Sequence, residues 1–122
     1  MIGLKAVLNF IGRGYIQLSW SANYREASEY LFKDDRLLRD PDLVARDGLT
    51  AWLVSFWFWK TRIQNDPGVQ RGEFGASTKI INGFVECGNG WNERAKQRFA
   101  LYKKILKAFN IFEEAIEQGC YN

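Results

Sequence analysis

From Asp47 to Lys60 the sequence reads Asp-Gly-Leu-Thr-Ala-Trp-Leu-Val-Ser-Phe-Trp-Phe-Trp-Lys, a run in which nearly every side chain is apolar. Asp47 is a typical N-cap, because its carboxylate can accept hydrogen bonds from the unpaired amides of a first helical turn. A helix without a polar face is normally buried at the centre of its domain, where each large apolar side chain contributes roughly 1.5–3 kcal/mol. The run therefore predicts a buried central helix that anchors the fold.

Three further helices and one short strand are predicted around this run. Apolar residues recur at helical spacing from about Ser21 to Phe32, and an apolar stripe with lysines opposite it continues from Ala95 to Phe109. Ser77 can cap a shorter helix that reaches Phe84. The pattern predicts a mainly α-helical fold with about four helices and a short strand, residues 15–19.

The segments between these elements are predicted to be connectors. Residues 34–42 are polar, and 64–75 contain a Pro-Gly pair and two further glycines, so we expect a polar connector and a long exposed loop. Further glycines predict turns at 12–14 and 88–90. A chain of 122 residues supports one core, and we expect a single domain over residues 1–122.

The stretch from Gly12 to Tyr24 carries neutral polar side chains in an ordered pattern. Gln17 and Ser19 alternate along the predicted strand and so face the same side, and Asn23 follows where the next helix begins. Their amide and hydroxyl groups, beside the aromatic rings of Trp20 and Tyr24, suit a carbohydrate, which presents both hydroxyls and flat apolar ring faces. The alternative is a polar turn with two helix caps.

Composition excludes several kinds of chemistry. The chain has no histidine, which rules out Ser-His-Asp triads and histidine-ligated metals within it, and its two cysteines alone cannot form a structural zinc site. We expect no metal and no cofactor. The net charge of +3 is mild and interspersed, so we expect no nucleic-acid partner, and no apolar run is long enough to predict a membrane partner. From the residues alone, Cys87 and Cys120 are either two core thiols or one disulfide.

Several blocks in the same order resemble the glycoside hydrolase family 19 chitinases. They are Gly-Arg-Gly-x-Ile-Gln-Leu-Ser at 12–19 with Asn-Tyr at 23–24, Ile-Ile-Asn-Gly…Glu-Cys-Gly at 80–88, and the series Arg94, Arg98, Tyr102, Lys103 and Lys104. The segments 40–45 and 57–59 fill the interval in the family's order. The resemblance covers about Phe10 to Phe109 and implies the C-terminal portion of a lysozyme-like catalytic domain.

The family resemblance implies hydrolysis of β-1,4-linked N-acetylglucosamine polymers such as chitin, with inversion at the anomeric carbon. Inverting glycosidases need two carboxyl groups, and in this family both are glutamates upstream of the Gly-Arg-Gly element. Met1–Ile11 contains no Asp or Glu. We therefore expect a piece of a longer protein that is inactive, or nearly so, alone. The alternatives are a non-catalytic chitin- or carbohydrate-binding module and a relative of peptidoglycan hydrolases.

The resemblance also assigns roles to individual residues. Ser19 would position the attacking water, while Gln17 and Asn23 would hydrogen-bond the N-acetylglucosamine rings. Asn82, with Ile81 packing beside it, would contact the sugar or its acetamide from the opposite wall. For Asn82 the alternative is a helix C-cap before Gly83.

Glu86 and Arg98 are expected to form a supporting pair behind the sugar-binding residues. A carboxylate held by an arginine has a lowered pKa, which is unsuitable for a proton donor near neutral pH. The alternative for Arg98 is an exposed salt bridge with Glu93 or Glu86, which would contribute little. Arg13 is expected to be a structural ion-pair partner. The other candidate carboxylates are expected to lie on a solvated surface: Glu26, Glu29, Glu113, Glu114 and Glu117.

The resemblance favours the disulfide between Cys87 and Cys120, which closes a loop of about 34 residues and would contribute roughly 3–4 kcal/mol. It also implies an extracellular or secreted protein, although Met1–Leu8 has neither the apolar length nor the cleavage site of a signal peptide. Without the family's upstream segment, apolar surface would stay uncovered, so self-association is a further hypothesis.

Overall fold

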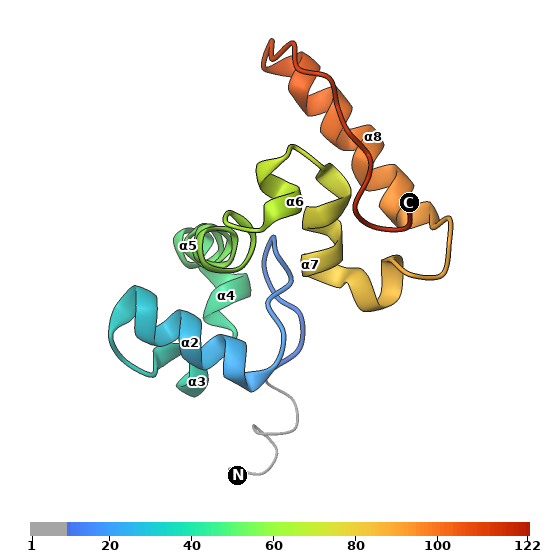
Figure 1. The fold of residues 1–122 in the computed structure, drawn as a ribbon. Coiled ribbons are helices and arrows are strands. Elements are labelled where there is room, and N and C mark those ends of the chain that lie inside the picture. Colours follow the sequence, from blue (N-terminus) through green and yellow to red (C-terminus); the bar gives the residue numbers. More distant parts are fainter. Residues whose placement is uncertain (1–9) are drawn as a thin grey trace. The chain divides into compact units, whose positions relative to one another are not determined.

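The computed structural model describes residues 10–122 and divides the chain into two compact units, with the boundary after Thr61 (Figure 1). The described residues contain seven α-helices, one π-helical turn and no β-strand beyond two isolated bridges. This confirms the mainly α-helical fold. The expectation about a signal peptide in Met1–Leu8 lies outside the described residues, and the single-domain organisation of residues 1–122 stays a prediction.

The first unit packs four α-helices around one apolar core. In chain order they are α2 (Ser21–Phe32), α3 (Arg36–Arg39), α4 (Leu43–Arg46) and α5 (Gly48–Phe58), and the π-helical turn Trp59–Ile63 continues α5 across the boundary. The bounds of α2 agree with the sequence prediction. Buried side chains from the turn before α2 and from all four helices meet in this core: Leu18, Tyr24, Ala27, Leu37, Val44, Val54 and Trp57.

Helix α5 begins as predicted but is not buried all round. The Asp47 side chain accepts a hydrogen bond from the Thr50 amide at 3.0 Å, so the expected N-cap is confirmed. One face packs Val54 and Trp57 into the core. The opposite face is exposed and carries the apolar side chains of Leu49, Trp52, Phe56 and Trp59. The prediction of full burial is wrong, because a run that is apolar on every face does not reveal which face the tertiary structure covers.

Residues 34–42 contain a helix that the sequence did not predict. In α3, Leu37 is fully buried, so this segment is more than a polar connector. The Ser28 hydroxyl joins α2 to it by accepting from the Leu37 amide at 3.0 Å and donating to the Asp34 carbonyl at 2.8 Å. At the end of α2, Tyr30 is exposed although its spacing placed it on the apolar face.

The second unit consists of α6 (Pro67–Gln70), α7 (Phe74–Glu86), α8 (Glu93–Ala108) and a C-terminal tail. The predicted long loop over 64–75 is wrong, because Asp66 caps α6 by accepting hydrogen bonds from the amides of Gly68 and Val69. Ser77 is not a cap. It lies inside α7 and donates its hydroxyl to the Phe74 carbonyl at 2.7 Å.

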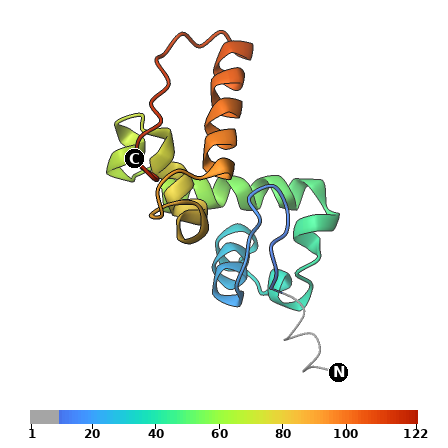
Figure 2. The same ribbon diagram turned by 90° about the vertical axis from the view of Figure 1, so that its right-hand side faces the viewer.

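The tail returns from the far end of α8 towards the start of α7 (Figures 1 and 2). The Phe74 amide donates to the Ile116 carbonyl at 2.9 Å, and Cys120 forms the expected disulfide with Cys87. Gly75 is where the tail backbone comes closest, since a Cβ there would lie 2.5–2.7 Å from the Glu117 and Gln118 carbonyls and the Cys120 amide. Only glycine leaves room for this contact.

Helix α8 buries apolar side chains only near its start, and on one side. Ala95 and Phe99 are buried, and Phe74 stacks on Tyr102 with ring centroids 4.5 Å apart. Ile105 and Phe109, which the predicted stripe included, are exposed. None of the helices between residues 10 and 122 combines the length and hydropathy that a membrane crossing needs.

Candidate functional site

Residues 12–20 form a tight turn rather than the predicted strand. Arg13 and Leu18 pair through both backbone hydrogen bonds, and the Gln17 amide donates to the Gly14 carbonyl at 3.2 Å. Gln17 itself has φ 57°, in the left-handed region that reverses the chain. The strand prediction assumed that alternate side chains face the same side, and this does not apply to a turn.

Gln17 and Ser19 nevertheless lie next to each other, over the bare backbone of Gly12. A Cβ on Gly12 would lie 2.8 Å from Gln17 Oε1 and 3.4 Å from Ser19 Oγ. Gln17 donates through Nε2 to the Gly14 carbonyl at 2.8 Å, and Ser19 donates through Oγ to the Gln17 carbonyl at 3.0 Å. The Asn23 side chain joins them by donating to the Ser19 carbonyl at 2.9 Å. The turn thus brings together all three polar residues predicted in this stretch.

Tyr24 and Arg13 belong to the core beneath this turn. Tyr24 is 0% exposed, so the prediction that its ring faces a sugar is wrong. Its hydroxyl donates to the Ile11 carbonyl at 2.6 Å and accepts from Arg13 Nη1 at 2.8 Å, while burial raises the pKa of Tyr24. Arg13 also pairs with Asp42 at 3.0 Å, which confirms its structural role. Together these bonds hold the base of the turn.

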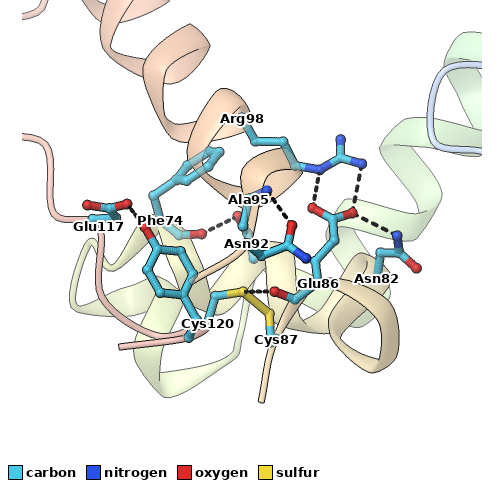
Figure 3. Close-up of a disulfide and its surroundings, with 11 residues drawn as sticks. Phe74, Asn82, Glu86, Cys87, Asn92, Ala95, Arg98, Glu117 and Cys120 are labelled. Carbon is cyan, nitrogen blue, oxygen red and sulfur yellow. Dashed lines mark hydrogen bonds and ion pairs between the residues drawn. A yellow bond between two sulfur atoms is a disulfide. The ribbon is translucent and has the colours of Figure 1, made fainter. Parts of the chain in front are cut away.

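The second unit contains a buried polar network around Glu86, at the end of α7 (Figure 3). Glu86 is 1% exposed and accepts from Arg98 Nε at 2.8 Å and Nη2 at 2.9 Å. Asn82 donates to the same carboxylate at 2.7 Å. The hydrogen bonds from Arg98 first, and then that from Asn82, hold the pKa of Glu86 below its usual value despite burial. Glu86 and Arg98 form the predicted ion pair, and the lowered pKa of Glu86 makes it unsuitable as a proton donor near neutral pH.

Asn82 lies at a kink in α7. Its backbone, with φ −149° and ψ 35°, leaves the helical region, and the helix resumes and continues to Glu86. Asn82 therefore ends the first of two helical stretches within α7, at the position where the alternative placed a helix C-cap before Gly83. The kink turns its amide towards Glu86, and the neighbouring Ile81 is exposed.

The other five candidate glutamates are either paired or exposed. Glu117, expected on a solvated surface, is instead half-buried, paired with Lys96 at 3.1 Å and hydrogen-bonded by the Tyr121 hydroxyl. The remaining four glutamates in question are exposed: Glu26, Glu29, Glu113 and Glu114. Among residues 10–122, no three His, Cys, Asp or Glu side chains gather where they could hold a metal ion.

A hollow of about 560 Å³ lies elsewhere in the second unit, between the last turns of α8 and the start of the tail. Its lining includes Leu106, Ile111 and Phe112. None of the predicted sugar-binding residues lines it, so this hollow is not the site that the sequence indicated.

Two comparisons with known proteins agree with this fold. The crystal structure of a bacterial family 19 chitinase superposes with a TM-score of 0.75 at 32% identity, covering 90% of this chain and 55% of that chain. Inactive chitinase-like protein 1 of Hevea brasiliensis and chitinase 12 of Oryza sativa subsp. japonica are each 34% identical over an alignment of 131 residues that covers 93% of this chain. The chain spans 41% and 39% of those two proteins.

The fold and these similarities define the class as a mainly helical, lysozyme-like glycoside hydrolase domain. The family model described as chitinase class I matches residues 3–72, which is more than half of the chain. This chain therefore belongs to the glycoside hydrolase family 19 chitinases.

Proposed function

We propose that this chain supplies the sugar-binding part of a family 19 chitinase site. Gln17, Ser19 and Asn23 hydrogen-bond the N-acetylglucosamine residues of chitin or a related β-1,4-linked polymer. The observation that carries the proposal is the meeting of Gln17 and Ser19 over Gly12, with Asn23 joined to them through the Ser19 carbonyl. Gly12 has no side chain to fill this space, so a sugar hydroxyl can approach the amide and the hydroxyl together.

In the proposed division of labour, these 122 residues bind the polymer and position water, and they do not transfer the proton. An inverting glycosidase needs an acid and a base about 6.5–9.5 Å apart. Ser19 would hold the water that attacks the anomeric carbon. The charged state of Glu86, fixed by Arg98 and Asn82, supports this division because it removes the one buried carboxylate of the described chain from the list of acids.

In the second unit, we propose that Asn82 and Ile81 also contact the polymer. One amide hydrogen of Asn82 is used by Glu86, which leaves its carbonyl oxygen and second amide hydrogen for a sugar or acetamide. Glu86 and Arg98 would then orient the Asn82 amide without touching the sugar themselves. Ile81, exposed on the turn before the kink, offers apolar contact.

The test is a calorimetric titration of the 122-residue chain with chitotetraose, together with a hydrolysis assay. We expect binding without significant turnover, and about tenfold weaker binding by Gln17→Ala, which corresponds to about 1.4 kcal/mol. Gln97→Ala, which removes an exposed amide on α8, is the matched control and should bind like the unmodified chain. Equal affinity of both variants would contradict the assignment of Gln17. Robust turnover would contradict the division of labour.

A non-catalytic carbohydrate-binding role is the second candidate. It is favoured by the similarity to a protein named inactive chitinase-like protein, which is as strong as that to a protein named chitinase. Peptidoglycan shares N-acetylglucosamine with chitin, so titration with muropeptide fragments separates a chitin-binding protein from a relative of peptidoglycan hydrolases. Tighter binding of muropeptides than of chitotetraose would favour the latter.

We also propose an extracellular or secreted location. The disulfide between Cys87 and Cys120 supports it, since disulfides form and persist in oxidising compartments. Thiol labelling of the protein isolated from its natural source tests this. Both cysteines should be unreactive until a reductant is added.

We also propose that two copies of the chain associate through the exposed face of α5. Leu49, Trp52, Phe56 and Trp59 follow a three-four-three spacing, which is the pattern of a helix–helix seam. In an antiparallel pair of α5 helices, Lys60 of one copy would lie near Asp47 of the other, so the charges at the two ends are complementary. The largest exposed apolar patches of monomers commonly mark interaction sites.

Sedimentation velocity over a range of concentrations tests this proposal. We expect a dimer that dissociates on dilution and that Trp52→Glu abolishes. Leu101→Glu changes an equally exposed apolar residue on α8 and should leave the dimer intact. A clean monomer at every concentration would contradict self-association.

A further inference from the structure

Trp20 adopts a backbone conformation that tryptophan rarely adopts. Its φ of 74° and ψ of 138° lie in a region populated almost only by glycine, at a cost on the order of 1–3 kcal/mol. Backbone hydrogen bonds hold it there. The Trp20 amide donates to the Phe10 carbonyl at 2.9 Å, and its carbonyl accepts from the amides of Asn23 and Tyr24 at 3.1 and 3.2 Å. The surrounding structure therefore fixes the strained conformation.

Neither folding nor helix capping accounts for a tryptophan at this position. Trp20 is the N-cap of α2 and provides no side-chain hydrogen bond to the helix, whereas Ser, Thr, Asp, Asn and Gly are the residues that favour an N-cap. Its side chain is 75% exposed, so it contributes little to the core. Glycine would adopt this backbone without strain.

The indole also differs from the other exposed rings of the first unit. Tyr15 packs on Trp52 with ring centroids 4.3 Å apart, and Trp52 stacks on Phe56 at 5.9 Å, so these rings cover part of one another's faces. No aromatic pair among residues 10–122 includes Trp20. With 75% of its side chain exposed, Trp20 is accessible to a ligand.

The exposed ring of Trp20 belongs to the same short segment as Gln17, Ser19 and Asn23. Trp20 directly follows Ser19, and consecutive α-carbons lie only about 3.8 Å apart. Asn23 follows within one turn of α2 and donates to the Ser19 carbonyl. A pyranose ring has hydroxyls at its rim and apolar C–H groups on its faces, so it needs hydrogen-bonding groups and a flat apolar surface side by side.

We propose that Trp20 is a sugar-contact residue, whose indole stacks on a pyranose ring of the polymer that Gln17, Ser19 and Asn23 hydrogen-bond. This inference rests on the proposed function and deepens it, because it assigns the aromatic platform of the same site. The strained backbone holds the indole outward before the sugar arrives, so binding does not have to order it.

The experiment compares three variants of Trp20 in the full 122-residue chain. Trp20→Ala and Trp20→Gly should each bind chitotetraose about five- to tenfold more weakly, in keeping with the loss of one aromatic stacking contact. Trp20→Phe should retain part of the affinity. Trp20→Gly should also raise the melting temperature, since it relieves the strain. Trp91→Phe, at another exposed tryptophan, is the control and should change neither quantity.

A direct readout comes from the indole N–H signals in a ¹H–¹⁵N NMR spectrum. The signal that disappears in Trp20→Phe identifies Trp20, and it should shift on addition of chitotetraose while the Trp91 signal stays in place. A structural role for Trp20 predicts instead that Trp20→Gly lowers stability and affinity together, and this result would overturn the inference.

The outcomes also distinguish a failure of this inference from a failure of the proposed function. If Gln17→Ala weakens binding while Trp20→Ala binds like the unmodified chain, the stacking role is wrong and the proposed function stands. If the unmodified chain does not bind chitotetraose at all, both are wrong.

Discussion

The turn before α2 and the network around Glu86 are both rich in polar groups, yet they are opposite in character. In the turn, Gln17 is exposed and both Gln17 and Trp20 have positive φ, so the backbone is strained while polar groups face solvent. Around Glu86, the carboxylate is buried, and Arg98 and Asn82 satisfy it. The described residues contain no buried side-chain nitrogen or oxygen without a hydrogen-bond partner.

This difference distinguishes a region that can bind a ligand from one that holds the fold. A buried carboxylate that is already satisfied inside the protein has little to offer a sugar, whereas the exposed side chain of Gln17 exchanges water for a sugar hydroxyl at small cost. The strained backbone of Trp20 supports neither a side-chain cap nor a core contact, and such outliers cluster at functional sites. The comparison predicts that changes at Glu86, Arg98 or the disulfide affect stability, while changes in the turn affect sugar affinity.

The largest expected effect is the loss of the disulfide. The double variant Cys87→Ser/Cys120→Ser should unfold with a free energy roughly 3–4 kcal/mol lower, because the unfolded chain regains the freedom of a loop of about 34 residues. Urea denaturation measures this. NMR signals of the turn, including those of Gln17 and Ser19, should keep their positions at low urea. A reductant should destabilise the unmodified protein but not the double variant, and equal stability of the two would contradict the prediction.

Removal of Arg98 is expected to have the next largest effect. Arg98→Ala leaves the Glu86 carboxylate buried without its cation, which costs about 3 kcal/mol of unfolding free energy. Arg94→Ala, at an exposed arginine one turn earlier on α8, should cost less than about 0.5 kcal/mol. Similar losses in the two variants would show that the pair at Glu86 behaves like an exposed salt bridge.

Acid should weaken the second unit through Glu86. Because its pKa is lower in the folded than in the unfolded protein, the carboxylate stabilises the fold at pH values above its unfolded pKa of about 4.3, and this stabilisation is lost as the pH falls through the folded value. Glu86→Gln removes the titration, so its stability should vary less between about pH 6 and about pH 3. Thermal melts across this range measure the difference. Parallel pH profiles would contradict the role of Glu86.

The smallest expected effect on stability comes from Gly12→Ala, which nevertheless tests the turn most directly. The new methyl group would meet the flexible end of Gln17, at 2.8 Å from Oε1, so Gln17 has to move while the backbone does not. We expect less than about 1 kcal/mol change in stability but several-fold weaker chitotetraose binding. Gly48→Ala, where nothing lies within 4 Å, is the control and should leave binding unchanged. Unaltered binding by Gly12→Ala would contradict a site over Gly12.

Local sequence signals predicted the parts of the fold that depend on neighbouring residues. The Asp47 cap, the bounds of α2 and the turn at 88–90 follow from side chains within a few positions of each feature. Ser77 was assigned wrongly as a cap, because α7 begins earlier, at Phe74. The Phe74 amide donates to the Ile116 carbonyl of the distant tail, a contact that local sequence does not reveal.

The three polar residues predicted in the turn lie together, but on a different backbone conformation from the predicted one. Gln17, Ser19 and Asn23 come together through a turn with positive φ, whereas the sequence suggested a strand. The sequence placed the ring of Trp20 beside the polar residues but gave no signal of its strained backbone conformation. Tyr24 was misassigned because an aromatic residue at helical spacing fits a core and a sugar platform equally well.

The sequence by itself determined the helical class, the family and the polar residues of the turn, because these depend on periodicity, caps and ordered motifs that neighbouring residues define. Only the tertiary structure decided which face of α5 is buried, that Tyr24 lies inside and Trp20 outside, and that Glu86 is held charged by Arg98. These outcomes depend on contacts between residues far apart in the chain, and burial, which sets both packing and pKa, is a property of the assembled fold.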